Sequence, residues 1–123
     1  MRCNETPRRL PSPVTPLRPI AGGAEETRVA RWMEQAGSHQ TRALMWLRRS
    51  RDPAAGPQPP TQRREFLLRA LEHLVSARRL LERARDETQD PSLLAILEEH
   101  LARLATTAAS TEQLLNEIDA AQG

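Results

Sequence analysis

Hydrophobic residues recur every three or four positions through the last third of the chain. The segment LLAILEEHLARL, residues 93–104, has this spacing, which continues to Ile118. Such a period predicts an amphipathic α-helix whose apolar face must pack against another element. Two heptad positions hold the apolar residues: position a has Leu94, Leu101, Ala108 and Leu115, and position d has Leu97, Leu104, Thr111 and Ile118.

Residues 61–88 carry a matching repeat. Position a holds Leu67, Leu74, Leu81 and Thr88, and position d holds Ala70, Ala77 and Ala84. Because a packs against d when two coiled helices run antiparallel, we expect six layers that are all centred on Gln89. The expected pairs are 84 with 94, 81 with 97, 77 with 101, 74 with 104, 70 with 108, and 67 with 111. The sequence therefore predicts a coiled-coil-like antiparallel hairpin.

The turn and one flank of this hairpin support the same register. The turn TQDPS, residues 88–92, offers Asp90 as an N-cap and Pro91 as the first helical residue. Position e carries arginines on one helix and acids on the other: Arg64, Arg78 and Arg85 against Glu98, Glu112 and Asp119. We expect Arg78 to meet Glu98, and Arg64 to lie between Glu112 and Asp119. Exposed pairs contribute about 0.2–1 kcal/mol each, so they set orientation more than stability.

Prolines divide the rest of the chain. Nine of them fall within residues 7–19 and 53–60, and the tenth is Pro91. Because proline breaks helix interiors, the proline-free windows predict helices at about 24–51, 61–88 and 91–121. Short connections favour antiparallel neighbours, so the expected fold is all-α: a three-helix antiparallel, up-down-up bundle over residues 24–121. Residues 1–23 are expected to form a disordered Pro/Arg-rich tail.

The first helix has one apolar stripe. Its members are Val29, Trp32, Met33, Ala36, Ala43, Leu44, Trp46 and Leu47. We expect this stripe to cover the position-g flank of the hairpin, which contains Phe66, His73, Leu80, Leu93, His100 and Leu114. Gly37 interrupts the helix at a cost of about 1 kcal/mol relative to Ala. A closely approaching neighbour would explain it.

Leu68, Leu71 and Val75 lie on the opposite side of the second helix. Residues 66–75 are therefore apolar nearly all round, which three helices cannot easily bury. Either the first helix sits askew and covers part of this strip, or the strip binds a partner helix or a second copy of the chain.

Candidate chemistry is sparse. His39, His73 and His100 all point inward by pattern, and the first two are expected at one level. His100 stands about 7 Å further along the axis, at 1.5 Å per residue, so a three-histidine metal site is not expected. There is no Gly-rich phosphate loop and no H-E-x-x-H motif. We therefore expect no metal, no cofactor, no small-molecule substrate and no enzymatic activity.

The charge is unevenly distributed along the chain. The net charge is +2, and all eighteen basic residues are arginine, with no lysine. Five arginines are expected to cluster where the first two helices meet: Arg48, Arg49, Arg51, Arg63 and Arg64. Such a cluster can contact nucleic-acid phosphates or an acidic partner. A solvated or acid-paired end is the simpler interpretation.

The proline-rich tail holds a weak recognition motif. The string PVTPLR places Pro13, Pro16 and Arg18 at the spacing of polyproline ligands of SH3 domains. A plain flexible extension is the alternative. No run of 18 apolar residues and no signal-peptide core is present. We expect a soluble intracellular protein, which in a eukaryotic host would be cytoplasmic or nuclear.

Two functional hypotheses remain. The first is a non-enzymatic protein–protein interaction module, an adaptor or assembly subunit that binds a partner helix or itself through Leu68, Leu71 and Val75. The alternative is a nucleic-acid-associated accessory protein that uses the arginine-rich end.

Overall fold

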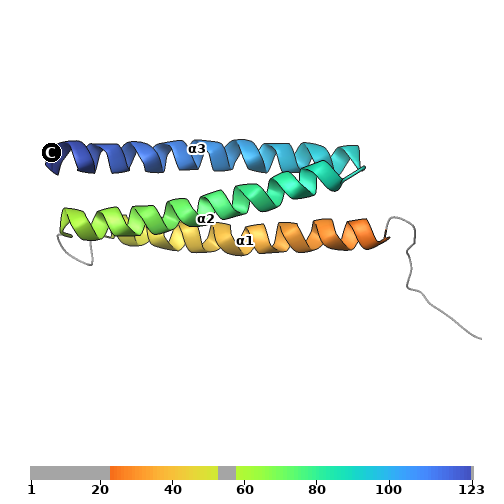
Figure 1. Ribbon diagram of the computed structural model, residues 1–123, viewed down its shortest axis with the longest axis horizontal. Helices are drawn as coiled ribbons and strands as arrows, with labels where there is room; N and C mark the ends of the chain where they lie inside the picture. Colours follow the sequence, from red (N-terminus) through yellow and green to blue (C-terminus); the bar gives the residue numbers. More distant parts are fainter. Residues whose placement is uncertain (1–22, 53–57, 123) are drawn as a thin grey trace, which may run out of the picture.

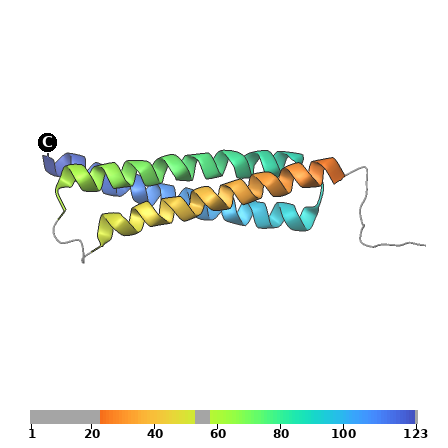
Figure 2. The same cartoon turned by 90° about the horizontal axis from the view of Figure 1, so that it is seen from below.

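The structure, a computed structural model, describes residues 23–52 and 58–122. Within these ranges it contains three α-helices and no strand: α1 (Gly23–Arg51), α2 (Pro60–Glu87) and α3 (Pro91–Gln122). The helices lie lengthwise along one long axis in both views (Figures 1 and 2). The all-helical prediction is confirmed, and each helix end lies within one residue of its expected position. The predicted tail lies outside the described residues.

Local sequence explains where the helices begin and end. Pro60 opens α2, where its missing N–H is no loss, and the carbonyl of Pro59 accepts from Gln62 N–H at 3.0 Å and Arg63 N–H at 3.1 Å. At the far end, Thr88 N–H donates to the carbonyl of Ala84 at 3.0 Å. Asp90 Oδ1 accepts from Ser92 N–H at 2.9 Å, so the predicted N-cap of α3 is confirmed.

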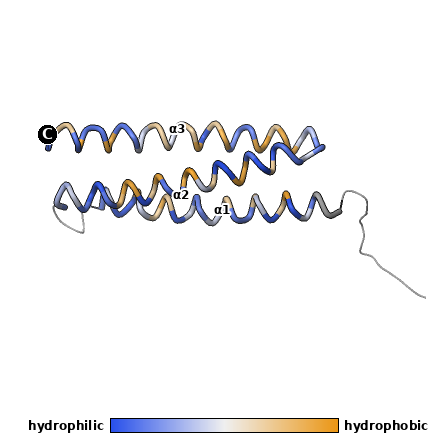
Figure 3. Tube along the Cα trace, viewed as in Figure 1, coloured by the Kyte–Doolittle hydropathy of each residue, from blue (hydrophilic) through white to orange (hydrophobic). Residues whose placement is uncertain are grey.

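The core is centred on α2, whose buried residues alternate between leucine and alanine. They are Leu67, Ala70, Leu74, Ala77, Leu81 and Ala84. α3 contributes Leu97, Leu104, Thr111, Leu115 and Ile118. Leu74 and Leu81 share one cluster with Leu97 and Leu104. The alternation of hydrophobic and hydrophilic positions is visible along every helix in Figure 3.

α1 packs along α2, whereas the backbones of α1 and α3 hardly approach each other. Val29, Ala36, Ala43 and Leu47 are its buried apolar residues. The expectation that α1 covers the position-g flank agrees with its contacts to Phe66 and His73 and with the clusters that it shares with Leu80, Leu93 and Leu114. It was wrong for Leu44, which is 53% exposed. The side of α1 that carries Leu44 therefore remains exposed, whereas its buried residues share core clusters with both α2 and α3.

Ion pairs fix the ends of the helices. Near one end, Arg28 Nη2 lies 3.1 Å from Glu87 Oε1. Near the other, Arg64 Nε lies 2.8 Å from Asp119 Oδ1, as the flank pattern predicted. The predicted Arg78–Glu98 pair was wrong: both residues are exposed, and the described part of the chain has no ion pair between them. Solvent screening leaves little to hold two such exposed side chains together.

None of the helices in the described ranges is long and apolar enough to cross a membrane.

Gly37 lies in the middle of α1 in open surroundings. A Cβ built on it meets no heavy atom within 4 Å, so the expected close approach of a neighbour within the chain is wrong. The conformational cost of a helical glycine is thus uncompensated by packing inside the monomer.

Replacing Gly37 by Ala should stabilise the protein. At protein concentrations low enough for the chain to be monomeric, we expect Gly37→Ala to raise the free energy of unfolding by about 0.5–1 kcal/mol, because alanine is the better helix former and the added methyl group meets no neighbour within the chain. Urea denaturation followed by circular dichroism measures this change. Ser38→Ala, at the adjacent exposed position, should give a smaller gain, and an unfavourable effect of Gly37→Ala would contradict the open geometry.

Candidate interaction surfaces

The predicted apolar strip lies on α2 and is partly covered. Leu68 is 37% exposed, and Leu71 and Val75 are half-buried. Leu71 packs against the cluster formed by Leu67, Ala70, Leu47 and the end of α3. One side of the strip thus packs against the core, and Leu68 is the most exposed residue of the strip.

One flank of α3 borders this strip. Arg64 and Leu71 are seven residues apart and therefore share a face of α2. Since Arg64 binds Asp119, the face of α2 that carries Leu71 looks towards the flank of α3 that carries Asp119. On that side α3 also exposes Ala105, which lies about 40° from Asp119 around the helix at 100° per residue.

The predicted arginine cluster divides into two groups. Arg63 and Arg64 are half-buried and held by the fold: Arg63 Nε donates to the carbonyl of Ser50 at 3.3 Å, and Arg64 binds Asp119. Arg48, Arg49 and Arg51 form the last turn of α1 and are exposed. Cations are favourable there because they face the negative end of the helix dipole. Only this second group is available to an external anion.

An aromatic cluster next to this end was not predicted as a unit. The ring centroids of Trp46 and Phe66 lie 5.6 Å apart, and the guanidinium carbons of Arg49 and Arg69 lie 5.0 and 5.3 Å from the Trp46 ring centroid. Glu65 binds Arg69 at 2.8 Å. The sequence signal was available: Trp46 and Arg49 are three residues apart, as are Phe66 and Arg69. These contacts join α1 to α2 and border a shallow cavity of about 490 Å³.

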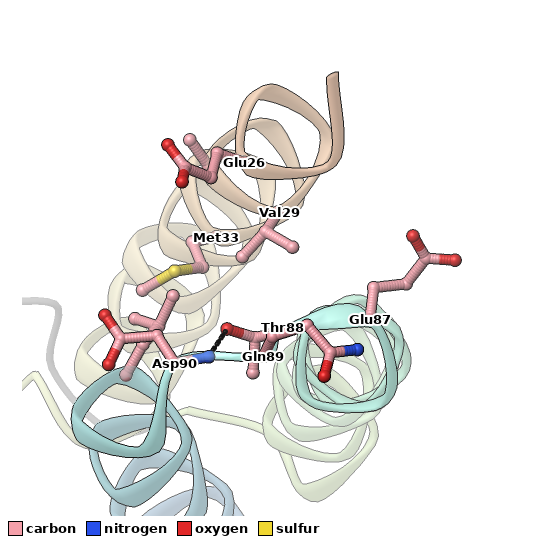
Figure 4. A pocket seen from close by; sticks show the side chains of 9 residues that line it. Glu26, Val29, Met33, Glu87, Thr88, Gln89 and Asp90 are labelled. Carbon is pink, nitrogen blue, oxygen red and sulfur yellow. Dashed lines mark hydrogen bonds between the residues drawn. The ribbon is translucent and has the colours of Figure 1, made fainter. Parts of the chain in front are cut away.

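A larger pocket opens between the start of α1 and the connection from α2 to α3. Its volume is about 660 Å³, and its apolar lining comes from Val29, Ala30, Met33 and Leu93. Figure 4 shows Glu26, Met33 and Asp90 pointing to one side of the pocket, and Glu87 pointing to the other. Glu87 is the carboxylate that binds Arg28. Sequence reasoning missed this pocket, because it depends on α1 and α3 remaining apart.

His39 and His73 lie at one level, as predicted. Their Nδ1 atoms are 2.9 Å apart and their ring centroids 5.2 Å apart, so one ring donates an N–H that the other accepts. Burial lowers the pKa of His73, and the nearby His39 and Arg42 lower it further, whereas Glu72 opposes them. Two imidazoliums could not form this bond, since each would offer only a donor.

Metal ligands do not gather around this pair. Across residues 23–52 and 58–122, no group of three or more His, Cys, Asp or Glu side chains could hold a metal ion. His100 is half-buried on α3 and takes no part in the His39–His73 contact. Cys3 and the tail motif of Pro13, Pro16 and Arg18 lie outside the described residues.

Comparison of the chain with protein-family models, with curated proteins and with solved structures finds no match. The surfaces themselves are therefore the basis for assigning a function.

Acid should weaken the α1–α2 contact at the histidine pair. Because the pKa of His73 is lowered from its ordinary value of 6.5, the unfolded chain takes up the proton at a higher pH than the folded chain. The contribution of His73 to stability is therefore fully present above pH 6.5 and decreases as the pH falls below it. Denaturation at a series of pH values between 7.5 and 5 measures this decrease.

Two variants distinguish the titration of the histidine pair from other effects of low pH on stability. His73→Gln should flatten this part of the stability curve, because glutamine does not titrate. His100→Gln removes a half-buried histidine outside the pair and should leave the slope in place. Equal slopes in the wild type and in His73→Gln would show that the pair does not respond to pH.

Proposed function

We propose that this protein is a non-enzymatic protein–protein interaction module whose α2 strip, Leu68, Leu71 and Val75, docks a helix of a partner protein. We further propose that the three helices form an antiparallel, up-down-up bundle in which α2 and α3 are a coiled-coil-like hairpin. The observation that carries the function is the 37% exposure of Leu68 beside half-buried Leu71 and Val75.

Contacts at both ends support the proposed arrangement. Residues near the start of α1 and the end of α2 are joined by the Arg28–Glu87 pair. The end of α1 and the start of α2 are joined by the hydrogen bond from Arg63 to Ser50. When two neighbouring helices are antiparallel, the start of one lies beside the end of the other.

The apolar character of the strip favours a helical occupant. Leu68 and Val75 are seven residues apart, and Leu71 lies between them, so the three side chains form one short ridge along α2. An amphipathic helix laid along this ridge would bury its apolar face, at about 25 cal/mol per Å² of apolar area removed from water.

Polar residues near the ridge would orient the occupant. Arg78 lies seven residues after Leu71 on the same face, is exposed, and belongs to no ion pair in the described part of the chain. An acidic residue on the partner would meet Arg78 at this end of the ridge. Charge pairs of this kind select a partner and its direction more than they add affinity.

Leu68→Glu should weaken partner binding. Placing a carboxylate on the ridge removes a leucine contact worth about 1.5–3 kcal/mol, so the dissociation constant should rise at least tenfold. Affinity purification with the tagged full-length chain identifies proteins that the wild type retains and the variant loses, and calorimetry on the leading one measures the constant. Circular dichroism confirms that the variant is folded.

Ile96→Glu is the matched control. Ile96 on α3 is 46% exposed and lies outside the strip, so the same substitution there should leave partner binding intact. Loss of the same partners in both variants would mean that general hydrophobicity, not the strip, is responsible. Retention of every partner by Leu68→Glu, with unchanged affinity, would refute the docking surface.

The exposed arginines at the end of α1 favour a second candidate, accessory contact with nucleic-acid phosphates. Arg48, Arg49 and Arg51 present three cations within one turn, next to a half-buried Trp46. Such contacts are insensitive to base sequence and weaken steeply with salt.

Replacing all three arginines by Gln should remove this binding. If phosphate contacts operate, the wild type shifts single-stranded or duplex probes at low salt, and the triple variant shifts them only at much higher protein concentration. Arg63 and Arg64 are left unchanged because they bind Ser50 and Asp119. The absence of any shift by the wild type at low salt would eliminate this candidate.

A further inference from the structure

One line of residues follows the side of α1 that carries the exposed Leu44. Glu26 and Leu44 are eighteen residues apart, which is five turns at 3.6 residues per turn, so they lie on the same line along the helix. Met33 and Arg51 lie within 20° of that line by the same arithmetic. Leu44 is 53% exposed, Met33 is half-buried, and Glu26 and Arg51 are exposed. We call these four residues the α1 face.

The charges and apolar residues of the α1 face are complementary to those of a second α1 face that runs in the opposite direction. It begins with an acid at Glu26, continues through two apolar residues, Met33 and Leu44, and ends with a base at Arg51. The midpoint between Glu26 and Arg51 falls between residues 38 and 39, and so does the midpoint between Met33 and Leu44. A second α1 laid antiparallel about this point therefore sets acid against base and Met33 against Leu44.

Gly37 lies close to this midpoint. A Cβ on Gly37 would meet nothing within 4 Å, so no contact inside the monomer accounts for a glycine there. A glycine at a helix crossing lets two backbones approach more closely than any side chain would allow. Gly37 would allow a helix from outside the monomer to approach α1 closely at this point.

The pocket at the start of α1 provides room for a leucine. Met33 and Leu93 belong to its apolar lining, and Glu26 and Asp90 point to the same side as Met33 in Figure 4. Neither carboxylate belongs to an ion pair in the described part of the chain. An occupant that carries a leucine followed by arginines would match both the lining and the charge.

We propose that this protein forms a two-fold symmetric dimer through the α1 face, with α1 of each copy antiparallel to α1 of the other. Leu44 of each copy enters the pocket of the other beside Met33 and Leu93, and Arg51 faces Glu26 across the interface. Arg48, one turn beyond Leu44, then lies near Asp90 of the second copy. Gly37 lies at the crossing of the two helices.

A second copy fits this site better than an unrelated helix because the face is self-complementary. A two-fold interface uses the same patch twice, so each contact of residue i with residue j is repeated as j with i. The α1 face meets that condition for its charges and for its apolar residues.

Sedimentation velocity of the full chain over a range of concentrations tests the dimer. The wild type should change from the 13.8 kDa of the single chain to twice that mass as its concentration rises. Leu44→Glu should raise the dimer dissociation constant at least about tenfold, since each dimer loses two buried leucines. Met45→Glu is the matched control on α1: Met45 is 37% exposed, points about 100° away, and should leave the dimer intact.

A charge exchange tests the antiparallel register. Glu26→Arg alone and Arg51→Glu alone should each weaken the dimer, because each places like charges opposite one another. The double variant should restore association, because every facing pair is again of opposite sign. Gly37→Leu adds a side chain at the crossing and should dissociate the dimer while the helix persists by circular dichroism.

The inference is overturned by a chain that stays at 13.8 kDa at all concentrations. It is also overturned by a dimer that Leu44→Glu leaves unchanged, or one that the charge exchange does not restore. Leu68→Glu separates this surface from the α2 strip: it should leave the dimer mass unchanged, whereas Leu44→Glu should leave partner binding through the strip unchanged. Either proposal can therefore fail without the other.

Discussion

The packing of α2 against two helices at once is the constraint on which the rest of the structure depends. Its buried face alternates leucine with alanine, and Ala70, Ala77 and Ala84 are completely buried. Alanine lets a neighbouring helix come close, whereas the leucines between them fill the space so created. Both α1 and α3 use this face, and since their backbones hardly approach each other, each is held mainly through α2. The open surface of the molecule follows from this arrangement.

Much of the fold could be predicted because the signals are local or depend on a simple period. Proline positions fixed the helix windows, the Asp90–Pro91 pair fixed the start of α3, and the heptad repeat identified the buried residues of α2. The Arg64–Asp119 pair followed from the heptad register, and the shared level of His39 and His73 followed from the expected chain reversal between the first two helices. In each case the position of one residue relative to another along the axis was sufficient.

The orientation of α1 could not be predicted, because its apolar stripe is too wide to define one direction. Val29, Ala36 and Ala43 specify a face, but Trp32, Met33, Leu44 and Trp46 extend it on both sides. Which of these is buried depends on where α1 sits around α2, and the period of the sequence does not encode that. The exposure of Leu44, the open surroundings of Gly37 and the pocket beside Met33 all follow from this one undetermined angle.

Both proposed surfaces exist because three helices leave some apolar residues exposed. The two surfaces differ in the kind of helix that their residues would bind. The α2 strip has one exposed leucine among half-buried neighbours and mixed charges, which suits a partner helix of complementary sequence. The α1 face has an acid at one end, a base at the other and a glycine near its centre. This arrangement is complementary to a reversed copy of itself and would not match an arbitrary helix. The proposed dimer would give a structural role to Gly37, which weakens its own helix by about 1 kcal/mol relative to Ala and where a Cβ would meet no atom of the same chain.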